Sequence, residues 1–154
     1  MNNQQDLTIL LEETFLNIRV AILLETPSGF VFEKSKDGYI FLLGGRVKLN
    51  ETTQEAASRE MFEELKLENI DIEMISVIEN FFSTADNKNI HEINFVYKAT
   101  LPQSIDLSIF TSDNGNNGYC YIKMDKFDKH DIRPKIIKEF LKNKKSFVHL
   151  ITRE

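Results

Sequence analysis

Three glutamates, Glu60, Glu63 and Glu64, are the residues of this chain whose types and spacing are best suited to chemistry. In a helix, at about 100° per residue, they fall within an arc of roughly 100° and share one face. Clustered carboxylates repel each other unless a cation lies among them. Mg²⁺ and Mn²⁺ prefer oxygen ligands, and bound Mg²⁺ is commonly completed by substrate phosphates. The face therefore indicates either a metal-assisted reaction on a pyrophosphate or a solvated acidic surface.

The residues that precede this face favour the metal site. Gly44 and Gly45 allow a tight backbone path and a close approach of main-chain carbonyl groups to a cation. Asn50 tolerates a left-handed conformation just before the helix. Glu51 and Arg59 are spaced so that the arginine can reach back and hold the loop against the helix. Taken alone, Arg59 is equally well explained as a surface charge.

The spacing of these residues resembles the signature of the Nudix hydrolases, G-x5-E-x7-R-E-U-x-E-E-x-G-U, where U is a bulky aliphatic residue. The match spans 23 residues, and the positions in register are Gly45, Glu51, Arg59, Glu60, Met61, Glu63, Glu64 and Leu67. The resemblance implies an α/β fold, the Nudix α/β/α sandwich with a mixed sheet and flanking helices, over a single domain of residues 1–154. It also implies MutT-like chemistry, in which water attacks phosphorus and cleaves the pyrophosphate bond of a nucleoside diphosphate linked to another moiety.

The same resemblance implies roles for the residues of the acidic face. Glu60 and Glu64 are the leading ligands of Mg²⁺ or Mn²⁺, joined by the main-chain carbonyl of Gly44. Glu63 is either a further ligand or a base that acts on a metal-bound water. These assignments predict that Glu64→Gln abolishes divalent-dependent hydrolysis without unfolding the protein.

By resemblance, Glu51 and Arg59 hold the loop and the helix together, and two neighbouring positions depart from the family pattern. The glycine that usually follows the helix is Lys66, which costs about 1 kcal/mol in a left-handed conformation unless the helix runs on further. The proline often found before the two glycines is Leu43. Neither change removes a ligand, so we expect activity to survive.

Three residues outside the signature are candidate contacts for substrate or metal. Arg19 lies in an apolar run, where a charge needs a partner, and it can reach the pyrophosphate or pair with a glutamate. Many family members add a carboxylate from a later loop, and Glu92 and Asp113 are the candidates here. Asp113 lies in a Gly/Asn-rich loop, where an ordinary turn aspartate is the alternative. For Glu92 the alternative is a surface or cross-strand pair.

The whole-chain composition limits the partners. The chain has 154 residues, 42% of them hydrophobic, and a net charge of −5, which gives no long-range attraction to nucleic acid or to an anionic membrane. Its single cysteine, Cys120, cannot form an intramolecular disulfide, so we expect a cytoplasmic protein. We expect a small nucleoside diphosphate derivative as substrate, and no long nucleic acid or membrane as partner. The sequence leaves a homodimer and the identity of the substrate open.

The elements that position these residues are predicted in the order strands, helix, strands, helix. The first helix is predicted from about residue 54 to 65, capped by Thr52 or Thr53. We expect the Gly44-Gly45 pair to interrupt the strand before it, and Pro134 to occupy the first turn of the second helix, which ends near residue 142. The strands are predicted at 15–24, 30–32, 39–43, 70–82, 91–101, 119–124 and 147–151. Hairpin-linked strands dominate, which favours a mixed or antiparallel sheet with helices packed outside it.

A catalytically silent protein is the main alternative to an enzyme. Such a Nudix-fold module would bind a nucleotide, or regulate through it, without cleaving it. The loss of a glutamate from the signature would favour that hypothesis, but all of them are present. Turnover in the presence of Mg²⁺ or Mn²⁺ distinguishes the two functions.

Overall fold

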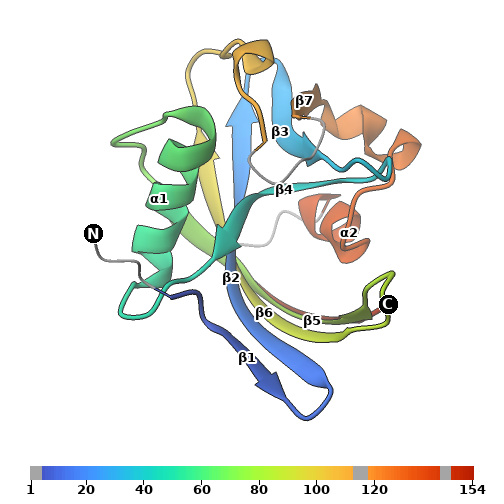
Figure 1. Cartoon of the computed structure of the whole chain (residues 1–154). Coiled ribbons are helices and arrows are strands. Elements are labelled where there is room, and N and C mark those ends of the chain that lie inside the picture. Colours follow the sequence, from blue (N-terminus) through green and yellow to red (C-terminus); the bar gives the residue numbers. More distant parts are fainter. Residues whose placement is uncertain (1–4, 113–117, 143–146) are drawn as a thin grey trace.

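A curved mixed β-sheet forms the centre of the structure, with α1 and α2 on opposite sides of it (Figure 1). The computed structural model describes residues 5–112, 118–142 and 147–154. The strands are β1 (Thr8–Leu11), β2 (Thr14–Thr26), β3 (Gly29–Lys34), β4 (Ile40–Arg46), β5 (Glu73–Ser83), β6 (Asn89–Thr100), β7 (Tyr119–Ile122) and β8 (Val148–Arg153). The helices are α1 (Thr53–Leu65) and α2 (Ile136–Lys142), and short 3₁₀ segments span Leu107–Ile109 and Met124–Lys129.

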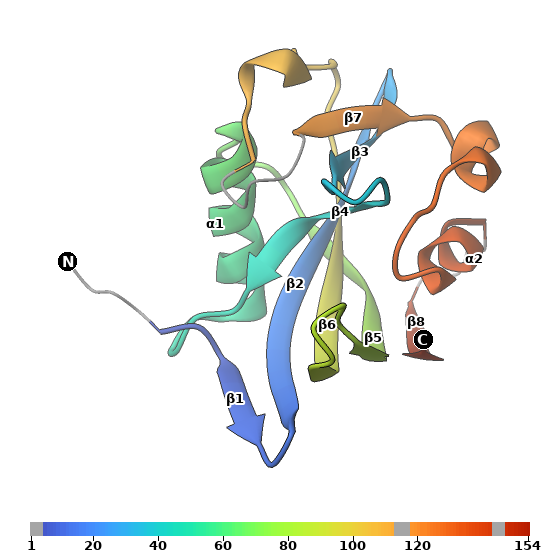
Figure 2. The same cartoon turned by 45° about the vertical axis from the view of Figure 1, so that its right-hand side comes forward.

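The long strand β2 connects the two halves of the sheet. The strand order is β7-β3-β4-β2-β6-β5-β8, and β1 pairs with β2 outside this path. The pairs β2–β6 and β5–β8 are parallel, and the other pairs are antiparallel, so the sheet is mixed, as predicted. The β1–β2 hairpin projects away from the two helices (Figure 2). Among the described helices, none is long and apolar enough to cross a membrane.

Two apolar cores lie on the two faces of the sheet because successive side chains of a strand point in opposite directions. Val20 and Ile22 of β2 pack in the cluster that contains Met61 of α1. Ala21 and Leu23 pack in the cluster that contains α2. The alternation along β2 therefore determines which side chains face each helix.

The first helix begins with a capping box and ends at a left-handed residue. The hydroxyl oxygen of Thr52 accepts a hydrogen bond from the main-chain N–H of Glu55, and the Glu55 carboxylate accepts one from the N–H of Thr52. Lys66 has φ 55°, and its main-chain N–H donates to the carbonyls of Met61 and Phe62. The helix therefore ends in the left-handed conformation that the glycine of the family pattern favours. Here a lysine adopts that conformation, which is sterically less favourable.

We expect Lys66→Gly to raise the free energy of unfolding by about 0.5–1 kcal/mol. Glycine adopts a positive φ without the steric penalty of lysine, and the hydrogen bond that is lost, from the Lys66 ammonium group to the carbonyl of Glu63, is exposed. Urea unfolding measures the change, and Lys126→Gly is the control for a lysine without a left-handed φ. A variant less stable than the wild type would contradict the assigned strain.

Three features differ from the sequence predictions. Gly44 and Gly45 lie within β4 and continue its pairing with β2. The two glycines let β4 approach β2 closely, and the strand does not end there. The strand β1 was not predicted, since its short run carries no alternating pattern. Pro134 precedes α2 and forms a tighter turn, in which its carbonyl accepts a hydrogen bond from the N–H of Ile137.

Candidate functional site

The double glycine lets β4 pass directly beside α1. A Cβ atom at Gly45 would overlap the carboxylate of Glu60, so this position brings the strand against the glutamate. Gly44 has φ +145°, and a Cβ atom there would overlap the main chain of Val20 in β2. Glycine is therefore needed at each position for a different reason, one to admit a side chain and the other to admit a backbone.

Arg59 holds the loop and the helix together. Its Nε and Nη2 atoms donate to the two carboxylate oxygens of Glu51, over 2.7 and 3.0 Å. The Nη2 atom also donates to the carbonyl of Arg46, over 3.0 Å. Burial raises the pKa of Glu51, but hydrogen bonds from Arg59 and from the main chain of Lys48 outweigh it and hold the pKa below its usual value. The contact suggested by the sequence spacing is therefore present.

Arg59 also binds the carboxylates of the acidic face. Its Nη1 atom donates to Oε1 of Glu60 over 2.7 Å and to Oε2 of Glu63 over 3.1 Å. Burial raises the pKa of Glu60, although Arg59 partly offsets this. Glu63 is the exposed member of the face, and its other oxygen lies 3.9 Å from Nζ of Lys48.

Glu64 is the least satisfied carboxyl group of the site. Burial raises its pKa to about 9, and the charges of Glu33 and Glu60 act in the same direction, while the main chain of Gly44 lowers it. Its Oε2 atom is buried and has no hydrogen-bond partner among the described residues. Without a cation, this carboxyl is protonated at neutral pH.

These donors fit a divalent cation. A buried oxygen without a partner beside a second carboxylate is the environment in which a hard cation replaces the missing interactions. In the described part of the chain, no three side chains of aspartate, glutamate, histidine or cysteine lie close enough together to hold a metal ion as they stand. Glu60 and Glu63 are instead hydrogen-bonded to the guanidinium group of Arg59.

A cavity of about 440 Å³ opens over the acidic face. Its lining combines both glycines and the three glutamates with Arg59 and with three other cationic side chains, those of Arg19, Arg46 and Lys48. Cations around buried carboxylates can neutralise phosphate oxygens while the carboxylates hold a metal ion. The arrangement is therefore chemically suited to a phosphate-containing ligand.

The three candidate residues outside the signature have different locations. Arg19 lines the cavity, and its Nε atom lies 3.7 Å from Oε2 of Glu92. Glu92 is buried within β6 and does not line the cavity described above. Glu92 is therefore a cross-strand ion-pair partner of Arg19. Asp113 lies outside the described residues.

Glu33 of β3 is a buried carboxylate near the site that the sequence reasoning missed. Its side chain is 1% exposed, and it accepts a hydrogen bond from the hydroxyl of Ser112. Its charge is one of the causes of the raised pKa of Glu64. One feature of the sequence could have indicated that Glu33 is buried: it directly follows the apolar run Phe30–Phe32. Both faces of that strand are buried in the structure.

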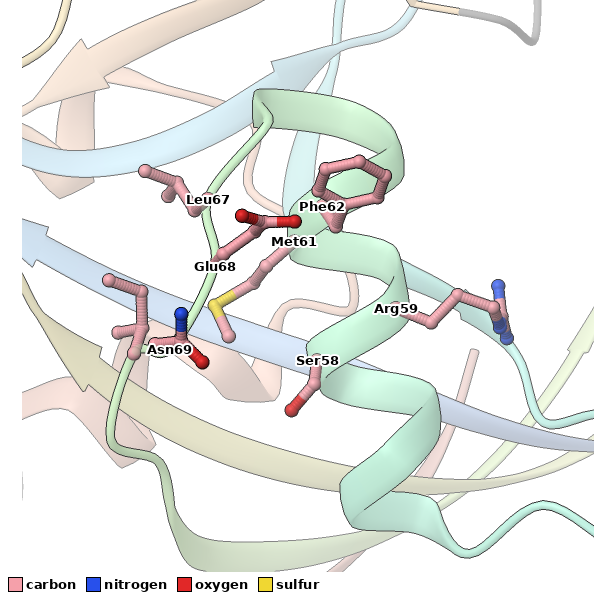
Figure 3. Close-up of a pocket in the computed structure, with 8 residues that line it drawn as sticks. Ser58, Arg59, Met61, Phe62, Leu67, Glu68 and Asn69 are labelled. Atoms are coloured by element: carbon pink, nitrogen blue, oxygen red, sulfur yellow. The ribbon is translucent and has the colours of Figure 1, made fainter.

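A second cavity, of about 450 Å³, lies on another side of α1. It is formed between the helix and the following segment, with Met61, Phe62 and Leu67 among its lining residues (Figure 3). Figure 3 shows the Arg59 side chain directed away from Leu67 and Glu68, across the helix. Glu60, Glu63 and Glu64 are absent from its lining, so this cavity is separate from the acidic face.

We expect Gly45→Ala to weaken divalent-cation binding at least about tenfold, because the added methyl group displaces the Glu60 carboxylate from its place beside β4. The displaced atoms are the far end of a flexible side chain, so the melting temperature should change little. Gly44→Ala is the contrasting variant, since its methyl group meets the backbone of β2 and should lower the melting temperature. Calorimetric titration with Mn²⁺ and thermal unfolding measure the two effects. Equal ion affinity in Gly45→Ala and the wild type would contradict the placement of Glu60.

The fold and the site together define an α/β/α protein with glutamates of one helix gathered beside a double glycine. The model of the NUDIX domain matches residues 15–143. The chain therefore belongs to the Nudix family, and the predicted fold class is confirmed. Membership supports hydrolysis of a pyrophosphate bond as the general activity, and enzymes of the family generally use divalent cations.

Solved structures with the same fold are distant in sequence. The mutator MutT protein from Bacillus halodurans superposes with a TM-score of 0.67 at 13% identity, covering 89% of this chain and 90% of that one. The MutT protein from Methanosarcina mazei Go1 gives a TM-score of 0.64 at 18% identity, with 86% and 94% covered. The dihydroneopterin triphosphate pyrophosphohydrolase of E. coli gives 0.64 at 11% identity, with 79% and 90% covered. No curated protein matches the chain in sequence.

Proposed function

We propose that this protein is a divalent-metal-dependent pyrophosphohydrolase. Its substrate would be a nucleoside diphosphate linked to another moiety, cleaved by attack of water on phosphorus. The observation that carries the proposal is the buried Glu64 carboxyl, which has an oxygen without a partner among the described residues and lies in a cavity lined by cationic side chains. The family match over residues 15–143 supports the same reaction.

The proposed metal ligands are Glu60, Glu64 and the main-chain carbonyl of Gly44. When bound, Mg²⁺ or Mn²⁺ would screen the phosphate charge, polarise the phosphorus–oxygen bonds and lower the pKa of a bound water. Glu63 is the exposed carboxylate, and it serves either as a further ligand or as the base that accepts a proton from water. Glu51 and Arg59 act by holding the ligands in place, through the two-point contact between them.

The cationic side chains of the cavity are proposed to bind the substrate phosphates. Arg19, Arg46 and Lys48 enter the cavity from β2, from β4 and from the segment after β4. Charge-assisted hydrogen bonds from these side chains would orient the pyrophosphate toward the glutamates. These three side chains provide cationic contacts for the phosphates in a chain whose net charge is −5 and which would otherwise repel a polyphosphate.

A panel assay tests the proposal. The full chain is incubated with nucleoside triphosphates, ADP-ribose and nucleotide sugars, each with Mg²⁺, with Mn²⁺ and with EDTA, and the nucleotide and phosphate products are measured. We expect cleavage of a pyrophosphate bond in at least one compound, lost with EDTA. Tight binding without turnover on every compound would instead support the catalytically silent nucleotide-binding or regulatory module.

A further inference from the structure

A group of apolar side chains lies on the face of the sheet that also carries the core around α1. Strand register places them on the same face as Ile18 and Phe95, which pack against that core. The strands that carry them lie in the order β1-β2-β6-β5-β8 across the sheet (Figure 2). We call this group the outer patch: Ile9, Leu11, Leu16, Ile93, Val77, Phe81 and Ile151.

The outer patch packs in neither core. Ile9, Leu11 and Ile151 are 51%, 57% and 57% exposed, and its other members are half-buried. None of its members belongs to either of the two apolar cores that the described residues form. The helix α1 packs on β4 and β2, so its contacts are to one side of the patch. Apolar side chains gathered on one exposed face mark an interaction surface.

The alternation along these strands also indicates that the outer patch is covered. A sheet with one face in water normally carries its polar residues on that face. Here the polar residues Asn17, Glu92 and Asn80 point to the opposite face, where they are buried. Their neighbours Leu16 and Ile93 point outward instead. The strands therefore present their apolar side where a solvated sheet would present its polar one.

The charges around the outer patch lie at its two edges. Within the patch, Glu79 is paired with His149 over 2.7 Å. At the β8 edge, the guanidinium group of Arg153 lies 4.0 Å from the centroid of the Phe81 ring, and no ion pair joins it to an acidic group of the described residues. At the β1 edge, the exposed turn of residues 12–13 carries two glutamates, which have no cationic partner in the described part of the chain.

This arrangement is complementary to itself. The strand β6 is in the middle of the order β1-β2-β6-β5-β8. A two-fold axis parallel to the strands at β6 places β1 of one copy over β8 of the other, and β2 over β5. Arg153 of each copy then lies at the edge where Glu13 of the other copy projects, and Ile93 faces Ile93 at the centre. A lipid surface has no such pattern of one cationic and one anionic edge.

The size of the outer patch fits a weak dimer. Strands are about 4.8 Å apart and alternate residues about 7 Å, so the patch covers roughly 500 Å² of each copy. Two copies together bury about 1,000 Å², which is near the lower end of the range for specific interfaces. Aligned packing of two sheets, face to face, is a common way to bury such surfaces.

We propose that the outer patch is the interface of a homodimer, in which two copies of this chain pack sheet on sheet about a two-fold axis at β6. The apolar rows provide the buried centre, and the contact of Arg153 with Glu13 at each edge fixes the orientation. The dimer leaves the cavity over the acidic face uncovered, because none of the residues of the outer patch lines that cavity.

The oligomeric state in solution tests the proposal. Sedimentation velocity of the full chain is measured from about 1 to about 300 µM, with EDTA and with a thiol reductant that prevents cross-linking through Cys120. We expect a monomer–dimer equilibrium with a dissociation constant between about 1 and 100 µM. A monomer at every concentration would overturn the inference. So would a monomer that floats with phosphatidylcholine vesicles, which would assign the patch to a membrane surface.

Variants then locate the interface. Leu11→Lys and Ile151→Lys should each raise the dissociation constant at least about tenfold, because each buries a charge between the two sheets. The matched control is Leu10→Lys, which lies in the same strand and is also 57% exposed, but whose pairing with Phe15 places it on the opposite face. It should leave the dissociation constant unchanged. Equal effects of Leu10→Lys and Leu11→Lys would overturn the assigned face.

Exchange of the edge charges tests the orientation of the two copies. Arg153→Glu and Glu13→Arg should each weaken the dimer at least about fivefold, because like charges then meet at both edges. The double variant restores opposite charges and should regain most of the affinity of the wild type. Both positions are exposed, so we expect all three variants to fold. A double variant that dimerises no better than the weaker single variant would overturn the two-fold arrangement.

The dimer and the proposed hydrolysis are tested independently. Turnover by a chain that remains monomeric would refute only the dimer. A dimer without turnover on any compound of the panel would refute the hydrolase and retain the interface.

Discussion

Replacing Glu64 by glutamine should lower divalent-dependent turnover about a thousandfold and leave the protein folded. Glutamine has the shape of glutamate but cannot hold a cation as a carboxylate does. Because burial raises the pKa of Glu64 to about 9, the native carboxyl is already neutral at pH 7 without metal, and the substitution changes little in the unliganded protein. Full turnover in the variant would show that the assigned ligand set is wrong.

The same variant should change how stability depends on pH. The folded pKa of Glu64 lies above the ordinary glutamate value of 4.5, so its stabilising contribution is fully present below about pH 4.5 and is lost as the pH rises toward 9. At pH 7 the loss is on the order of 3 kcal/mol. Glu64→Gln does not titrate, so its free energy of unfolding should vary less between these pH values than that of the wild type.

Urea unfolding at several pH values and kinetic assays with Mg²⁺ measure both effects. Glu68→Gln is the matched control, because Glu68 is an exposed glutamate just beyond the same helix and outside the acidic face. It should retain the turnover of the wild type and its pH dependence. Saturating Mn²⁺ should raise the melting temperature of the wild type and of Glu68→Gln, and should have little effect on Glu64→Gln.

Arg59→Met should lower the free energy of unfolding by about 3–5 kcal/mol. Methionine keeps much of the packing volume but leaves the buried carboxylates of Glu51 and Glu60 without their charged partner. For a chain of this length, the expected fall in melting temperature is about 10 °C. Turnover should fall as well, because Arg59 fixes the loop that carries Glu51 against the helix that carries the ligands.

The pH dependence of this effect identifies its cause. The pKa of Glu51 is held below its usual value, so its stabilising contribution is present above about pH 4.5 and is lost as the pH falls through the folded pKa. The difference between the wild type and Arg59→Met should therefore narrow in acid. Arg133→Met removes an exposed pair with Asp131 and should cost less than about 1 kcal/mol. A similar small cost for Arg59→Met would contradict the central role of its guanidinium group.

Local patterns were enough to predict the helix and its acidic face. The cap at Thr52, the positions of Glu60 and Glu64 and the reach of Arg59 to Glu51 all involve residues that are close together in the sequence. Helical periodicity and short-range spacing carry this information directly. The strands β2, β5 and β6 were also predicted within a few residues, because long apolar runs identify strands of this length.

The rest depends on register between distant segments. Nothing near Arg19 or Asn94 in the sequence indicates that these two residues are paired, since this follows from the register between β2 and β6. The burial of Glu33 likewise follows from its position between β4 and β7. A one-residue change of register would turn each of these side chains to the other face, and no local pattern in the sequence specifies that register.

The parallel pairing of β2 with β6 has a consequence for the order of folding. Its partners, such as Arg19 and Asn94, are 75 residues apart in sequence, whereas the contacts between Arg59 and Glu51 close a short loop. Short loops close at a lower entropic cost than long ones, so the segment from Gly44 to Glu64 can assemble before β2 pairs with β6. We therefore expect hydrogen exchange to protect α1 early in refolding and β6 later. A chain stopped at the first stage would have its glutamates gathered on a helix, but not the central pair of strands that completes the sheet beneath it.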